Sequence, residues 1–461
     1  MNMDYGALLP EIILMSGAIV ALLGGSFLPR RRQALVTWFA IAAACGSAVV
    51  AAVSTGPPTV FSDSYVLDAA TTTIRILVPL ATGIVMLIGR QESQGSARES
   101  ETASLLLLAA LGTVVLAGAN DLLIVATGFL LATVPLYALI GLSRSTTAAE
   151  ATMKTYLLGT VFGVVMLFGI AVLVSIAGGS TYPELQQALP HLPAAAVALG
   201  FIGVLAGLLF KAGAVPGHFW VPDAAEGSGI GIAAFVTTVP KLGALIALAR
   251  LVDVMPHTVN APLLVGVLAA ASMTLGTLAA FWQRSVPRLL GWSTVGQVGF
   301  LLMPVAVIGA EPYAHPALLI YLVFYAATNL ALFAAIAALP DRTTIPSWRG
   351  AAREHPVITG VVLVGLFSLV GTPPTAVFVG KLAVFTATWQ GGMPWLVVIA
   401  AAVSVASLFY ALRWVSTAFQ RPRTPRPPTA AVRLEAATAV ALGALVIVAA
   451  ATIPAVLVLV L

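Results

Sequence analysis

Long apolar runs separated by short polar connections dominate the chain. Inside the runs the apolar residues follow one another without strict alternation, which excludes a transmembrane β-barrel. Most runs reach the roughly 20 residues that a membrane-spanning helix needs. We count fourteen of them, at residues 7–28, 33–53, 66–89, 102–117, 120–142, 152–177, 194–222, 229–252, 261–283, 286–310, 316–339, 357–389, 394–419 and 434–459. The pattern therefore predicts an all-α polytopic membrane protein with about 14 transmembrane helices.

The composition supports lipid as the solvent of this chain. A length of 461 residues would otherwise suggest two to four soluble domains, but 60% of the residues are hydrophobic and only 8% are charged. Ordinary globular proteins carry about 25% charged residues, so this chain has too few charges to cover its surface in water. The net charge of +5 comes without a basic patch that contains interleaved aromatic residues, and we expect no nucleic-acid partner.

Arginine marks alternate connections. The loops after predicted helices 1, 3, 5, 9, 11 and 13 contain arginine, whereas those after helices 2, 4, 6, 10 and 12 contain no Lys or Arg. Cytoplasmic loops of membrane proteins carry the excess of basic residues. We therefore expect both termini on the outer side, which is the periplasmic side of a bacterial inner membrane. The loop after helix 7 is an exception, because it carries Asp223 and Glu226 without a basic residue.

The four lysines are distributed differently from the arginines. Lys154, Lys211, Lys241 and Lys381 all fall within predicted spans. A guanidinium group stays charged and suits anchoring, whereas a buried lysine amine can gain and release a proton. Lys154 is the weaker candidate, because a lysine near a helix end commonly extends to the membrane interface.

Two long predicted spans, the seventh and the twelfth, are interrupted by proline. Pro216 breaks one, and Pro373 with Pro374 breaks the other. Lipid cannot satisfy the carbonyls that a proline frees, so such breaks line protein-buried or hydrated cavities. The spans are five helices apart, and an odd offset makes the corresponding repeats inverted, a pattern that points to a transport site.

This offset suggests a division of the chain into four parts. We expect N-terminal helices 1–3 at residues 1–101, a first five-helix repeat (helices 4–8) at 102–260, and a second, inverted repeat (helices 9–13) at 261–420. Residues 421–461 would hold a cytoplasmic loop and helix 14. Two unrelated proline kinks are the alternative explanation.

These segments resemble the antiporter-like subunits of respiratory complex I over most of the chain. The strongest stretch is similar to the family signature FK-x-x-x-x-P-F-H-x-W-x-P-D. The matching residues are Phe210, Lys211, Pro216, His218, Trp220, Pro222 and Asp223, followed by Pro240-Lys241, the Arg288 to Phe300 stretch, Ser368 to Pro374, and Gly380-Lys381. Leu9 to Ile13, a lysine at position 381 and the end of the chain after helix 14 resemble the N-type branch of this family.

The resemblance implies a proton relay at mid-membrane depth. Lys211, Lys241 and Lys381 would be the titrating groups, His218 would connect Lys211 with Lys241, and Lys381 would exchange protons with the far side. The chain has one Cys, five His and no nucleotide-binding fingerprint, so we expect no cofactor on it. NADH, FMN, iron–sulfur clusters and quinone would belong to partner subunits of a complex I-type NADH-quinone oxidoreductase.

One departure from the family concerns the partner of Lys211. When Pro135 is aligned with the family motif, the glutamate that normally pairs with this lysine falls on Leu130. Asp121 or Asp223 could compensate for the missing acid. Elsewhere we expect Arg75 to pair with Asp68 on the same helix face, and Glu11 to be a helix-start residue.

Two other functions fit the same residues. The chain could belong to a multisubunit cation/proton antiporter or a membrane-bound hydrogenase, which share this module. It could also be a structural subunit that kept the fold and lost pumping, for which Leu130 is the evidence and the three lysines are the counter-evidence.

Overall fold

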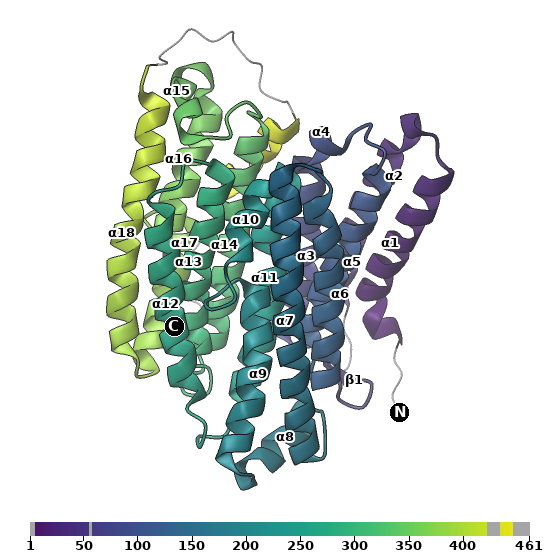
Figure 1. Ribbon diagram of the computed structural model, residues 1–461, viewed down its shortest axis with the longest axis vertical. Helices are drawn as coiled ribbons and strands as arrows, with labels where there is room; N and C mark the ends of the chain where they lie inside the picture. The colour runs from purple at the N-terminus through teal and green to yellow at the C-terminus, as the bar shows by residue number, and fades with distance from the viewer. Residues whose placement is uncertain (1–4, 55–57, 422–433, 446–461) are drawn as a thin grey trace.

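The computed structural model describes residues 5–54, 58–421 and 434–445, and it is a bundle of long helices joined by short connections (Figure 1). The long helices are α1 (Leu9–Phe27), α2 (Ala34–Val53), α3 (Ala69–Ile88), α5 (Glu99–Gly118), α6 (Leu122–Gly141), α7 (Thr146–Ala177), α9 (Ala194–Ala212), α11 (Ile230–Asp253), α12 (Ala261–Ala280), α13 (Val286–Val305), α14 (Ala314–Ala337), α16 (Pro356–Val370), α17 (Ala376–Gln390) and α18 (Pro394–Phe419). A helix at Leu434–Leu445 covers the start of the last predicted span, whose remainder lies outside the described residues.

Short elements join the helices. The helical ones are η1 (Tyr5–Leu8), η2 (Arg30–Arg32), α4 (Arg90–Ser93), α8 (Tyr182–Ala188), η3 (Leu189–His191), α10 (Trp220–Gly227), η4 (Ile345–Trp348) and α15 (Ala351–Glu354). Strands β1 (Thr59–Val60) and β2 (Tyr65–Val66) form a small antiparallel hairpin between α2 and α3.

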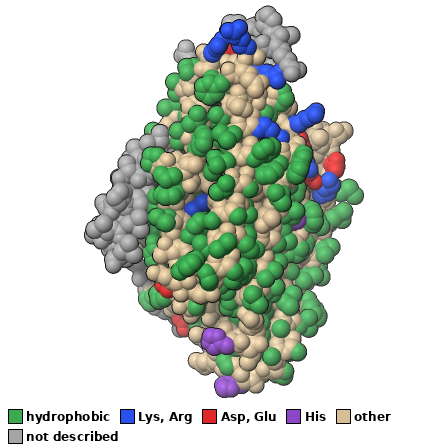
Figure 2. All heavy atoms as spheres, turned by 90° about the vertical axis from the view of Figure 1, so that its left-hand side faces the viewer, with side chains coloured by type: hydrophobic (Ala, Val, Ile, Leu, Met, Phe, Trp, Pro, Cys, Tyr) green, Lys and Arg blue, Asp and Glu red, His purple; other side chains and the backbone are tan. Residues whose placement is uncertain are grey.

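The bundle is built to lie in a membrane. Within the described residues, eleven helices are long and apolar enough to span one. The flank seen in Figure 2 is covered by hydrophobic side chains, while Lys and Arg gather toward its upper end and His toward its lower end. An apolar belt between two polar ends matches the layers of a bilayer.

Helix α11 is the centre of the bundle. Its most apolar stretch is completely buried, and it packs against α3, α5, α9, α13 and α14. Helices α7 and α18 bury only a third of the corresponding stretch and lie at the periphery. A polar group on α11 is therefore surrounded by protein on all sides.

The expected pairing of Arg75 with Asp68 is wrong. Arg75 on α3 instead binds Glu11 of α1 in a buried bidentate ion pair, with Nε–Oε1 at 2.7 Å and Nη2–Oε2 at 2.9 Å. Asp68 precedes α3, caps its first turn through the Thr71 N–H, and binds Arg250 of α11 at 2.9 Å. Glu11 thus links two helices rather than only starting one.

The Arg250 contact also sets the protonation of Asp68. Burial acts to raise the pKa of this carboxyl, but the hydrogen bond and charge of Arg250 outweigh burial and hold the pKa below its usual value. Asp68 is therefore a carboxylate at neutral pH, and it ties the start of α3 to the end of α11.

Candidate functional site: buried lysines at two helix breaks

The first helix break separates α9 from α10. Helix α9 ends at Ala212, and Gly213 adopts a left-handed conformation (φ 80°) that turns the chain out of the helix. Pro216 lies in the non-helical segment that follows. The Phe210 carbonyl, which accepts from the Gly213 N–H at 3.1 Å, also accepts a hydrogen bond from Trp220 Nε1 at 2.9 Å, so α10 closes back on the end of α9.

Lys211 is fully buried in the last turn of α9. Its Nζ donates to Thr133 Oγ1 of α6 at 3.1 Å, and no ion pair among the described residues includes it. Leu130, one turn earlier on α6, is 45% exposed on the outside of the bundle. The neutral hydroxyl of Thr133 therefore takes the position that faces the lysine.

Neither aspartate that could have compensated for the missing acid contacts Lys211. Asp121 caps α6 through the Leu123 N–H and accepts from Ser180. Asp223 of α10 binds Lys154 at 2.9 Å and Arg288 at 2.6 Å. The expectation that Asp121 or Asp223 replaces the missing partner acid of Lys211 is therefore wrong.

Lys241 occupies the middle of the buried helix α11. Pro240 has no N–H, so the Val236 carbonyl loses its helical partner. The Lys241 Nζ donates to this carbonyl at 3.0 Å and lies 5.7 Å from the centre of the Trp220 ring. The proline thus supplies the buried lysine with an acceptor inside its own helix.

His218 lies in the break between α9 and α10 and is 1% exposed. Its ring contacts Phe219 and Trp292, with centroid distances of 4.0 and 5.6 Å. The two ring nitrogens and Trp292 Nε1 are buried without a well-formed hydrogen bond to a described residue. Because buried polar atoms normally bond to protein or to ordered water, these nitrogens mark a polar spot between the break and α13.

The second helix break separates α16 from α17. Helix α16 ends at Val370, Gly371 is left-handed (φ 90°), and Pro373 and Pro374 lie in the gap before α17. Lys381 of α17 is buried and donates its Nζ to the freed Val370 carbonyl at 2.9 Å and to Ser404 Oγ of α18 at 3.2 Å. The Phe300 ring covers the amine at 4.0 Å.

A layer of neutral polar side chains joins α11 to the second break. Asn329 of α14 donates to the hydroxyls of Thr237 and Thr238 on α11, at 2.9 and 2.8 Å. Tyr325 donates to the Thr237 carbonyl at 2.6 Å. One turn away, Thr328 and Ser368 of α16 lie 3.2 Å apart.

The layer continues through Gln297 of α13. The Tyr321 hydroxyl donates to the Gln297 side-chain oxygen, and Gln297 Nε2 donates to the Leu369 carbonyl at 2.9 Å, beside the Lys381 acceptor. Sequence reasoning missed this layer. Tyr321, Tyr325 and Asn329 recur at every fourth position, which places them on one helix face and could have revealed it.

Lys154 does not join the other three lysines. Its side chain is 47% exposed on α7 and binds Glu150 at 2.6 Å as well as Asp223. Arg288 of α13 completes the cluster by binding both Asp223 and Glu226. This cluster explains the acidic loop that departs from the arginine pattern, because both acids are neutralised by cations from neighbouring helices.

Broken helices that carry buried lysines define a class of ion-translocating membrane proteins, and the comparisons specify which one. Residues 119–409 match the family model described as "NADH:quinone oxidoreductase/Mrp antiporter, TM". The chain belongs to this family, so the resemblance found in the sequence is confirmed.

Individual relatives narrow the similarity further. The chain is 49% identical to the NADH-quinone oxidoreductase subunit N of Mycobacterium sp. (strain JLS), over 89% of this chain and 88% of the relative. It is also 49% identical to subunit N 1 of Streptomyces griseus, over 91% and 89%. A chain of respiratory complex I from Thermus thermophilus superimposes with a TM-score of 0.83 at 28% identity, over 96% of this chain and 97% of that one.

Proposed function

We propose that this chain is the N-type, proton-translocating membrane subunit of an NADH-quinone oxidoreductase. The observation that carries the proposal is the set of three buried lysines, Lys211, Lys241 and Lys381, which bind hydroxyls and carbonyls and form no ion pair with a described acid. A buried amine without a fixed counter-charge is held in a state from which it can gain a proton and return it. The 49% identity to two named N subunits supports the assignment.

The relay would work by electrostatic coupling between neighbouring lysines. Protonation of one amine disfavours protonation of the next, so a proton shift at one site triggers release at another. His218 would connect Lys211 with Lys241 through water at the polar spot beside Trp292. Lys381 would exchange protons with the far side, where Ser404 and the open end of α16 meet its amine.

The layer of neutral polar side chains on and around α14 would connect Lys241 with Lys381. Hydroxyl and amide groups can both donate and accept, so they hold a chain of hydrogen bonds without adding a charge. Asn329 and Tyr325 contact α11, while Tyr321 reaches Gln297 and the second break. Water would have to complete a proton path between Lys241 and Lys381, because described hydrogen bonds of the layer end at the Thr237 and Leu369 carbonyls, which accept but cannot pass a proton on.

Two inverted repeats would explain why the breaks match. Corresponding helices of the two proposed repeats make the same contacts. In the first repeat, α5 packs on α6 and α11, and α7 packs on α9. In the second repeat, α12 packs on α13 and α18, and α14 packs on α16. Isolated β-bridges join Asp121 to Thr181 in the first half and Ser285 to Thr344 in the second. The connectors that follow them, α8 and α15, lie at opposite ends of the bundle (Figure 1).

The remaining proposals concern orientation, cofactors and Lys154, and they are supported by the arginine pattern and by the family relationship. The arginine-rich end would face the cytoplasm of a bacterial cell, with both termini on the periplasmic side of its inner membrane. NADH, FMN, iron–sulfur clusters and quinone would be bound by partner subunits, which deliver redox energy to this chain through their contacts with it. Lys154 would be a structural ion-pair residue outside the relay.

Substitution of single lysines tests the proposal. We expect Lys211→Met, Lys241→Met and Lys381→Met each to lower the number of protons pumped per electron in membrane vesicles, measured with assembly of the complex monitored in parallel. Lys154→Met is the matched control, because it removes a surface lysine and should leave pumping unchanged. Unchanged pumping in all three buried-lysine variants would instead favour a structural subunit.

Copurification addresses the other alternative. The complex isolated from native membranes through this chain should contain the quinone-reductase subunits. If antiporter or hydrogenase subunits are recovered in their place, the assignment to NADH-quinone oxidoreductase is wrong.

A further inference from the structure

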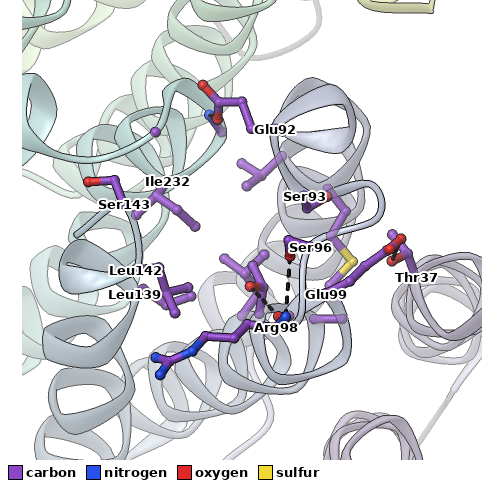
Figure 3. A pocket seen from close by; sticks show the side chains of 18 of the residues that line it. Thr37, Glu92, Ser93, Ser96, Arg98, Glu99, Leu139, Leu142, Ser143 and Ile232 are labelled. Atoms are coloured by element: carbon purple, nitrogen blue, oxygen red, sulfur yellow. Dashed lines mark hydrogen bonds between the residues drawn. The ribbon is translucent and has the colours of Figure 1, made fainter. Parts of the chain in front are cut away.

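A cavity of about 430 Å³ opens at the arginine-rich end of the bundle, between α3, α5, α6 and the start of α11 (Figure 3). It is separate from the lysine site and none of its lining residues takes part in the relay. Its volume lies within the range of roughly 300–1,000 Å³ typical of ligand sites.

The lining changes from apolar to polar along the cavity. Val85, Met86, Leu106, Leu139 and Ile232 form its inner part. The outer part carries the hydroxyls of Ser93, Ser96, Thr102 and Ser143 and the guanidinium groups of Arg98 and Arg144. An apolar interior below a cationic, hydroxyl-bearing rim is complementary to a molecule with an anionic head and a hydrocarbon tail.

The two acids of the lining are already engaged with protein groups. Glu99 is buried, accepts from Thr37 Oγ1 at 3.0 Å and from the Gly95 N–H at 3.2 Å, and points toward Thr37 in Figure 3. Glu92 accepts from the N–H groups of Ile230 and Gly231 at the start of α11, at 2.9 and 3.4 Å. Burial raises the pKa of the Glu92 carboxyl, and the two N–H groups act in the opposite direction.

Unlike the two acids, the two arginines of the lining, Arg98 and Arg144, have no close ion-pair partner among the described residues. Arg98 is 46% exposed, and the nearest acid to its guanidinium, Glu101, lies at 3.8 Å. Arg144 forms no ion pair within the described part of the chain. It lies in the loop between α6 and α7, where its backbone is left-handed (φ 51°). The rim therefore offers two cations without strong partners.

We propose that this cavity binds the phosphate-bearing headgroup of an anionic membrane lipid, with the start of one acyl chain in the apolar interior. Basic pockets between transmembrane helices at the basic side of a membrane protein have this chemistry. Arg98 and Arg144 would bind the phosphate. The Ser96 hydroxyl, which accepts from the Arg98 N–H, could donate to a further phosphate oxygen, whereas Ser93, Thr102 and Ser143 already donate to backbone carbonyls. The proposal depends on the membrane-spanning fold and not on proton translocation, so it stands or fails separately from the proposed function.

The test uses the intact complex. After delipidation, it is incubated with vesicles of phosphatidylcholine that contain a photoactivatable phosphatidylglycerol, and cross-linked peptides are mapped by mass spectrometry. We expect cross-links to α3, α5 and α6 around the cavity, and roughly a fivefold loss of this signal for each arginine removed in Arg98→Gln and Arg144→Gln. The double variant Arg30→Gln/Arg31→Gln removes two exposed arginines of the same end outside the cavity, and it should retain the cavity signal.

The source of the phosphate group is distinguished by competition. Millimolar inorganic phosphate should not displace the lipid, and a photoactivatable phosphatidylcholine should label the cavity peptides much less. Equal labelling by the two lipids, displacement by inorganic phosphate, or cross-links from the unmodified complex that avoid the cavity would overturn the proposal. The proposal would also fail if a side chain of a neighbouring subunit were found to fill the cavity. Labelling of the unmodified complex does not depend on the folding of any variant.

Discussion

Each buried lysine donates a hydrogen bond to a neutral oxygen, a carbonyl or a hydroxyl, rather than to a carboxylate. Lys241 and Lys381 use carbonyls that Pro240 and the end of α16 leave without helical donors, and Lys211 uses the hydroxyl of Thr133. A neutral acceptor satisfies an amine in either protonation state, whereas a carboxylate would favour the charged form. In the proposed relay, these neutral acceptors would leave each amine able to gain and release a proton.

Thr133 provides the most direct test of this argument. Thr133→Val removes the described hydrogen-bond acceptor of Lys211, and leaving a buried polar group without a partner costs about 1–3 kcal/mol. We expect proton pumping to fall several-fold in this variant at normal assembly, and Thr133→Ser, which keeps the hydroxyl, to retain it. Equal pumping by the valine and serine variants would show that Lys211 does not need this acceptor.

Gly371 tests whether the break positions Lys381. A Cβ at this residue would lie 2.8 Å from Lys381 Cδ, whereas one at Gly392 would meet no atom within 4 Å. Both glycines are left-handed (φ 90° and 82°), so either alanine costs about 1–2 kcal/mol of backbone strain. We expect Gly371→Ala to lower proton pumping several-fold and Gly392→Ala to lower only thermal stability. If both variants reduce pumping equally, strain rather than the position of the lysine is the cause.

The sequence predicted the charged residues of the site better than the neutral ones. A lysine inside an apolar run is rare enough to be noticed, and three of the four are indeed buried in the structure. Threonine and asparagine are common in helices, so Thr133, Thr237 and Asn329 carry no individual signal. Partners across helices, such as Glu11 for Arg75, depend on packing that spacing along one helix does not specify.

At the scale of elements, the ion pair between Glu11 and Arg75 holds α1 against α3. Both side chains are buried, and Tyr65 of the hairpin donates to Glu11 at 2.7 Å. Breaking a buried pair leaves an uncompensated charge and typically costs about 3–5 kcal/mol. We expect Glu11→Gln to lower the thermal stability of the complex clearly and to increase proteolysis near the N-terminus.

The control for this pair is an exposed one. Glu101→Gln removes a carboxylate 3.8 Å from Arg98, and a surface pair of this kind contributes about 0–1 kcal/mol. Similar stability losses in Glu11→Gln and Glu101→Gln would mean that the buried pair does not fasten α1.

Long elements followed from the sequence, and short ones did not. The thirteen predicted spans up to residue 419 each overlap at least one long helix of the structure, because continuous apolar runs of this length have few alternatives in lipid. The short helices α4, α8 and α15 and the hairpin contain too few residues to show a period. Local contacts fix some of them, such as the capping box of Thr181 and Glu184 at α8.

At the scale of the whole molecule, the inversion of the two repeats and the orientation of the chain in the membrane can be tested separately. On the flank seen in Figure 2, Lys and Arg gather toward one end of the bundle and histidines toward the other. The connectors η3 and η4 occupy corresponding places in the two proposed repeats and lie at opposite ends. If the repeats are inverted, one connector must face the cytoplasm and the other the periplasm, whichever way the chain inserts.

Cysteine labelling can measure both properties at once. In a Cys45→Ala background, which removes the only native thiol, His191→Cys places a thiol on the exposed end of η3 and Asp341→Cys places one just before η4. We expect a membrane-impermeant maleimide to label His191→Cys from the periplasmic side and Asp341→Cys only from the cytoplasmic side, because basic connections remain inside. Labelling of both from one side would refute inversion, whereas an exchange of the two sides would keep inversion and reverse the orientation.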